Sequence, residues 1–138
     1  MEVEQVLRNT PLFSQLQKKD IKRLASALTE RSFPAGAVII EQGKPGVGLF
    51  LIGDGTVTVS KDGKAIDTHE AGDYFGEVAL IDDGPRTAEV RADTDVQCFV
   101  LPAWQFRAIV SEHPDVSWAL LRTLVQRVVR DAEVPDRL

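Results

Sequence analysis

The chain has 138 residues, a length typical of a single domain, and its 16 basic and 21 acidic side chains give a net charge of −5. Hydrophobic residues make up 43% and charged residues 27%, which excludes a disordered tail, a fibrous repeat and a coiled-coil rod. An acidic chain lacks the basic surface that binding to nucleic acid or to an anionic membrane requires, so we expect neither partner.

The single cysteine, Cys98, lies in an apolar stretch and cannot form an internal disulfide, so we expect a buried thiol. The first residues lack the basic and apolar regions of a signal peptide. No apolar run approaches the roughly 18 residues of a membrane span. We therefore expect a cytoplasmic protein without membrane insertion.

Residues 1–34 have a helical pattern. A short helix is predicted over residues 4–7, before Pro11, and a second helix over residues 18–29. In the second helix, apolar side chains recur at spacings of three and four residues and form one stripe. The segment 34–36, with its proline and glycine, ends this helical character.

Residues 35–101 consist of short β-rich runs separated by glycines, with turns about every eight to ten residues, a spacing typical of a small β-sandwich or β-roll. Asp62-Gly63 predicts a tight hairpin because both central residues of such a turn need positive φ, and Asp54-Gly55 is a weaker case. The predicted strands include residues 38–40, 49–52, 56–59 and 96–101.

Helices return after Leu101. A short helix opens at residues 102–106, and Pro114 suits the first position of a last helix over residues 115–130. Both tryptophans, Trp104 and Trp118, are expected to pack against the core or a neighbouring helix. The last helix has a broad apolar face, which predicts a second partner surface, and this face comprises Leu120, Leu121, Leu124, Val125, Val128 and Val129.

The segment 72–88 breaks the rhythm of the strands. Residues 75–80 lack alternation and can form one helical turn, whose first amides have no internal partner and suit an anion. Gly76 allows a close approach of the backbone to a ligand. Arg86 offers a planar guanidinium for two phosphate oxygens. Glu77 can accept hydrogen bonds from a sugar hydroxyl, so with the hydroxyl of Thr87 the segment suits a ribose phosphate.

The run Phe75-Gly76-Glu77-Val78-Ala79-Leu80, followed by Pro85-Arg86-Thr87-Ala88, resembles the phosphate-binding cassette of the cyclic nucleotide-binding domain family. That family includes the catabolite activator protein, regulatory subunits of cyclic-AMP-dependent protein kinase, and cyclic-nucleotide-gated channels. Shorter matches, from residues 11–13 to residues 113–114, extend the resemblance over nearly the whole chain.

The resemblance implies an α+β, mainly β fold: an eight-stranded antiparallel β-roll or jelly roll flanked by N-terminal and C-terminal helices. It implies one domain over residues 1–138. Within it, residues 1–34 would form the N-terminal helical segment, and residues 35–101 the roll with the cassette at residues 75–88. Residues 102–138 would form the hinge and lid.

The resemblance also implies roles for single residues. Glu77 would accept the ribose 2′-OH and Arg86 would pair with the cyclic phosphate, while amides near Gly76, Ala79 and Thr87 would complete the phosphate site. Thr87 is compatible with cyclic AMP and with cyclic GMP, of which we favour cyclic AMP. The full set of predicted ligand-binding residues is Phe75, Gly76, Glu77, Val78, Ala79, Leu80, Pro85, Arg86, Thr87 and Ala88.

Plainer interpretations stay open for these residues. Glu77 can be an ordinary exposed loop carboxylate, Gly76 a simple turn glycine, and Thr87 a strand residue with an inward methyl group. Trp118, early in the predicted lid, can cover the nucleotide base instead of packing in the core.

Three functions compete. The leading one is a regulatory sensor without enzymatic activity, which binds a cyclic nucleotide and changes the position of its C-terminal helix. The second is a nucleotide-free dimerisation or docking module of the same fold, with a homodimer or an effector domain bound through that helix. The third is a cupin-like metal oxygenase, but His69 and His113 have no metal-ligand spacing, so we expect no metal.

The net charge of −5 excludes polyanions, which need many basic contacts, but it does not exclude one phosphodiester with a single charge. Residues 72–88 carry Asp73, Glu77, Asp82 and Asp83 against the single basic residue Arg86. Binding would therefore depend on local geometry and not on the overall field of the protein.

Overall fold

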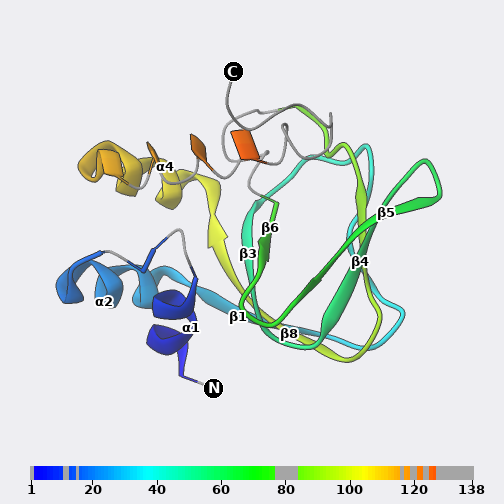
Figure 1. The fold of residues 1–138 in the computed structure, drawn as a ribbon, viewed down its shortest axis with the longest axis horizontal. Helices are drawn as coiled ribbons and strands as arrows, with labels where there is room; N and C mark the ends of the chain where they lie inside the picture. Colours follow the sequence, from blue (N-terminus) through cyan, green and yellow to red (C-terminus); the bar gives the residue numbers. More distant parts are fainter. Residues whose placement is uncertain are drawn as a thin grey trace.

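The computed structural model describes residues 2–10, 13–14, 16–76, 84–115, 117–118, 121–122 and 125–126. Two four-stranded antiparallel sheets form a β-roll, and the helices gather on one side of it (Figure 1). The eight strands found in these ranges confirm the mainly β fold predicted from the sequence. No helix among the described residues combines the length and hydrophobicity needed to cross a membrane.

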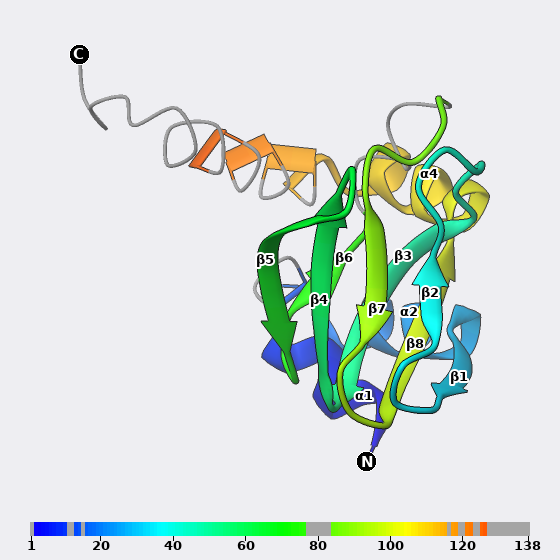
Figure 2. The same cartoon turned by 90° about the vertical axis from the view of Figure 1, so that its right-hand side faces the viewer.

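The two sheets have different neighbours. The first sheet packs between the helices and the second sheet, and its strand order is β1 (Thr29–Phe33), β8 (Val96–Pro102), β3 (Gly48–Asp54) and β6 (Tyr74–Phe75). The second sheet has the order β2 (Val38–Ile40), β7 (Glu89–Ala92), β4 (Thr56–Lys61) and β5 (Lys64–Glu70) (Figure 2).

Strand β3 contributes side chains to two apolar clusters, one on each face of the first sheet. Successive side chains of a strand point to opposite faces of the sheet. Leu49 and Leu51 lie in the cluster shared with the helices, whereas Phe50 and Ile52 lie in the cluster between the two sheets. Because both faces are buried, the strand needs apolar residues at every position and not only at alternate ones.

The tight turn predicted at Asp62-Gly63 is confirmed. It joins β4 to β5, and both residues have positive φ, +52° at Asp62 and +81° at Gly63. Gly55, with φ of +96°, connects β3 to β4 where Asp54-Gly55 predicts a turn. These turns fix the antiparallel pairing of consecutive strands.

Three helices flank the first sheet: α1 (Val3–Asn9), α2 (Lys18–Ala27) and α4 (Ala103–Glu112). The apolar stripe predicted for the second helix is confirmed, since Ile21 and Leu24 are fully buried. Phe106 and Ile109 anchor α4 in the same apolar cluster. The helical segments therefore share one core with the inner sheet.

The helical interpretation of residues 1–34 is wrong for its last part. Thr29–Phe33 is strand β1, which pairs antiparallel with β8 along its whole length. Its first four residues are exposed, so the strand has no apolar alternation that a sequence pattern can detect. The pairing with β8, a tertiary contact, decides its conformation, and the roll begins at residue 29 instead of 35.

The expectation that both tryptophans pack inside is also wrong. Trp104 is 69% exposed and Trp118 is 65% exposed. Trp104 lies two residues before the buried Phe106, and this spacing places it on the opposite face of α4. Cys98, in contrast, is fully buried in β8, as the sequence predicts, and desolvation raises the pKa of its thiol to about 12.

Candidate anion site at Arg86

Backbone hydrogen bonds hold the main chain of Arg86 in place. Its N–H donates to the carbonyl of Lys44 at 2.9 Å, and its own carbonyl accepts from the N–H of Gly43 at 2.8 Å. An isolated bridge between Pro45 and Pro85 adds a further link. The backbone of Arg86 is thus tied to the turn that follows β2, at residues 43–45.

The side chain of Arg86 crosses to two other backbone segments. Its Nη1 donates to the carbonyl of Gly76 at 2.8 Å, and its Nη2 donates to the carbonyl of Gly48 at 2.9 Å. Gly48 begins β3 and Gly76 directly follows β6. The guanidinium therefore joins the ends of two neighbouring strands of the inner sheet.

The charge of Arg86 is buried and unbalanced. The residue is 8% exposed, and within the ranges that the structure describes no carboxylate forms an ion pair with it. Its Nε is buried and has no hydrogen-bond partner there. Desolvation lowers the pKa of the guanidinium, because burial disfavours the charged form. A buried cation whose Nε–H has no partner is costly unless an anion completes it.

Glycine is required at both positions that hold the guanidinium. A Cβ atom on Gly76 would lie 2.8 Å from the carbonyl oxygen of Gly48 and 3.1 Å from Nη1 of Arg86, and its φ is +89°. A Cβ atom on Gly48 would lie 2.1 Å from the carbonyl oxygen of Leu101. Gly76 is therefore more than a turn glycine, since it also allows close contact with the arginine.

Phe75 supports the site from the core side. It is 3% exposed, and its ring stacks on that of Phe50 with centroids 5.0 Å apart and planes 5° from parallel. This stacking fixes the end of β6, from which Gly76 presents its carbonyl to Arg86. The structure places Phe75 in the apolar cluster between the sheets, one residue away from the arginine contact.

The neighbours of Arg86 in sequence lie at the surface or close to it. Thr87 is exposed and precedes β7, so the alternative of an inward strand residue is wrong. Pro85 is exposed and Ala88 is partly buried. Four of the predicted ligand-binding residues lie outside the described part of the chain, namely Glu77, Val78, Ala79 and Leu80.

Sequence analysis missed Gly48, whose carbonyl holds one arm of the guanidinium. A signal was available, because a glycine at the start of an apolar strand indicates a close approach of another backbone. Among the described residues, no three side chains suited to metal ligation gather.

Comparison with known proteins identifies the family. The sequence profile of the cyclic nucleotide-binding domain matches residues 30–113, which extend from within β1 to the end of α4. The chain belongs to the cyclic nucleotide-binding domain family. The resemblance predicted from the segment 75–88 is therefore confirmed at the level of the family.

Relatives of this domain occur in several kinds of protein. A cyclic nucleotide-gated potassium channel of Rhizobium etli is 36% identical over 89% of this chain and 34% of its own length. The regulatory domain of Toxoplasma gondii PKA, solved with cAMP, superposes with a TM-score of 0.73 at 31% identity, over 78% of this chain and 43% of that one.

The catabolite activator protein of Thermus thermophilus superposes with a TM-score of 0.80 at 28% identity, over 91% of this chain and 61% of that one. The first curated relatives are longer proteins, of which this chain matches 34% or less. The similarity thus concerns one domain of larger proteins.

Proposed function

We propose that this chain is a regulatory module that binds a cyclic nucleotide and performs no reaction on it. The observation that carries the proposal is Arg86, a buried guanidinium with a free Nε and no carboxylate partner among the described residues. A cyclic nucleotide presents one phosphodiester with one negative charge, which matches one such cation. Guanidinium–phosphate hydrogen bonds are charge-assisted and among the strongest in proteins.

The remaining contacts follow the family resemblance. Glu77 would accept the ribose 2′-OH, and amides near Gly76, Ala79 and Thr87 would complete the phosphate site. The exposed hydroxyl of Thr87 lies next to Arg86 in sequence and is available to a ligand. We favour cyclic AMP over cyclic GMP, a choice supported by similarity to a PKA regulatory domain solved with cAMP.

We further propose that residues 1–138 act as one domain whose C-terminal helix, from residue 115 onward, changes position when the nucleotide binds. The ligand would bind at the residue 75–88 segment and the helix would then fold over the base, with movement at the hinge around Phe106. A ligand can shift such an equilibrium only by its different affinity for the two states. An effector domain or a second copy of the chain would then bind the helix in one of its two positions.

Isothermal titration with cyclic AMP and cyclic GMP in parallel tests the proposal. We expect one site per chain and tighter binding of cyclic AMP. At about 100 times the Kd, the ligand would add roughly 2.7 kcal/mol of stability and raise the Tm by several degrees. Linear 5′-AMP is the matched control and should bind far more weakly. Absence of heat and of any Tm shift with both cyclic nucleotides at millimolar concentration would refute it.

One observation favours a second function, a docking or dimerisation module. Trp118, Leu121 and Val125 are 65%, 48% and 59% exposed, and they recur at spacings of three and four residues on the last helical segment. Light scattering after size exclusion, with and without nucleotide, separates the two functions. A stable dimer whose mass is the same with and without either nucleotide supports the docking module. A mass that changes when nucleotide is added supports the sensor.

A further inference from the structure

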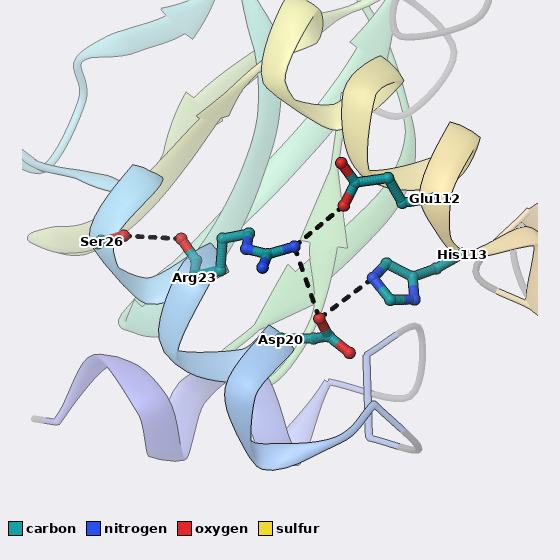
Figure 3. Close-up of polar contacts among 5 residues, drawn as sticks. All are labelled: Asp20, Arg23, Ser26, Glu112 and His113. Carbon is teal, nitrogen blue, oxygen red and sulfur yellow. Dashed lines mark hydrogen bonds and ion pairs between the residues drawn. The ribbon is translucent and has the colours of Figure 1, made fainter.

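We propose that Asp20 on α2 and His113 at the end of α4 form a clasp that holds the C-terminal helical segment away from the β-roll. The clasp comprises Asp20 and His113 together with the neighbouring pair Arg23 and Glu112 (Figure 3). It connects α2 to the joint from which the last helical segment begins.

Asp20 is a buried charge that depends on the clasp. Its side chain is 6% exposed, and Oδ1 lies 3.2 Å from Nε2 of His113 and 3.9 Å from Nη1 of Arg23. Oδ1 accepts no hydrogen bond of good geometry among the described residues. A buried carboxylate oxygen without a hydrogen bond is costly, and Nε2 of His113 is the nearer of its two partners in the clasp.

The other pair of the clasp lies at the surface. Arg23 Nη1 donates to Glu112 Oε2 at 3.0 Å, but both side chains are 60% exposed. Exposed ion pairs of this kind contribute little because water screens them. The strength of the clasp therefore resides in the buried contact between Asp20 and His113.

His113 occupies the joint between two helical segments. Its N–H donates to the carbonyl of Ile109 at 2.8 Å and closes α4, while its own φ of −131° and ψ of 83° leave the helix. Helical conformation resumes at Pro114. Phe106 and Ile109 fix α4 in the core, and the contact of His113 with Asp20 lies directly after this anchored helix.

The segment beyond this joint projects from the roll. Its described pieces point away from both sheets (Figure 2), and Trp118, Leu121 and Val125 are exposed. A side chain that fixes His113 against α2 therefore fixes the direction in which this segment leaves the domain. The clasp stabilises the projecting arrangement.

The regulatory consequence rests on the proposed function. If nucleotide binding favours an arrangement in which the helix folds over the base, the clasp competes with the ligand. The apparent affinity of a ligand falls with the population of the competent state. Weakening the clasp should therefore tighten nucleotide binding, which is the opposite of what the loss of a ligand contact does.

The test uses Asp20→Asn and His113→Gln, alone and combined, in the full chain. We expect each variant to lower the Kd for cyclic AMP at least about fivefold, in the range of ordinary coupling between sites. The double variant should gain no more than either single one, because both remove the same contact. Lys19→Gln, an exposed charge on the same turn of α2, is the control and should leave the Kd unchanged.

A second readout needs no nucleotide. Spin labels at Thr68→Cys and Gln126→Cys, both exposed positions, report the distance between the roll and the last helical segment. In the wild type we expect one narrow distribution, and in Asp20→Asn or His113→Gln a broader or shifted one. An unchanged distribution in both folded variants overturns the clasp, even where the chain binds neither nucleotide and the proposed function fails. A Kd that stays equal or rises in both variants also overturns it.

Discussion

The buried side chains of Asp20 and Arg86 have different kinds of partners in the same fold. The carboxylate of Asp20 lies 3.2 Å from the imidazole of His113 and 3.9 Å from the guanidinium of Arg23, so it has partners within the protein. Among the described residues, the guanidinium of Arg86 donates to two neutral carbonyls, its Nε has no hydrogen-bond partner, and no carboxylate pairs with it. An internally balanced charge holds structure together, whereas an unbalanced one is available to a ligand.

The largest expected effect concerns the unbalanced charge. Arg86→Ala should weaken binding of the cyclic nucleotide by about 10- to 150-fold, because it removes the cation proposed to pair with the phosphate and a charged hydrogen bond contributes about 1.5–3 kcal/mol. Arg86→Lys keeps the charge but loses the planar fork, so it should recover only part of the affinity. Titration calorimetry measures the affinity of both variants. Undiminished binding in Arg86→Ala would contradict the proposal that Arg86 pairs with the phosphate.

The next effect concerns the backbone around that arginine. Gly76→Ala should destabilise the fold more than Gly63→Ala, its matched control. Both glycines have positive φ, which costs a side chain about 1–2 kcal/mol. Only at Gly76 does the new Cβ meet atoms, the Gly48 carbonyl and Nη1 of Arg86, and such overpacking adds about 1–3 kcal/mol. Urea unfolding measures the difference, and equal losses would contradict the close contact.

Cys98 is a third buried titratable group, and unlike Asp20 and Arg86 it is buried in its neutral form. Its folded pKa of about 12 lies above the ordinary value of 9.0, so the unfolded state loses the proton first as the pH rises. Stability from this thiol is fully present below pH 9 and is lost between pH 9 and about 12. Cys98→Ala should flatten this alkaline decline in denaturant unfolding, and an equally steep decline in the variant would exclude the thiol as its cause.

The smallest effect concerns the exposed half of the clasp. Glu112→Gln removes the pair with Arg23 and should change the free energy of unfolding by about 0–1 kcal/mol, since exposed ion pairs are weak. His113→Gln should cost more, because it removes the nearer partner of the buried carboxylate of Asp20, whereas Arg23 lies at 3.9 Å. Thermal unfolding of the two variants in one buffer decides the order, and a larger loss in Glu112→Gln would reverse our ranking of the two contacts.

Much of the fold follows from local sequence. Strands β4 and β8 lie where the apolar and alternating runs predict them, and Asp62-Gly63 makes the expected turn. Strand β1 was not predictable, because its exposed polar residues form a strand only through pairing with β8. The exposure of Trp104 likewise depends on which face of α4 the core covers.

The sequence alone determined the family and the residue types of the candidate site. The glycine and the arginine lie close together in the chain, so their types and spacing can be recognised without the tertiary structure. Only the tertiary structure showed that the carbonyl of Gly48 holds Arg86, and that Asp20 lies against His113. These contacts join residues far apart in sequence. Their geometry depends on how the two sheets and the helices pack, and no local pattern of side chains records that packing.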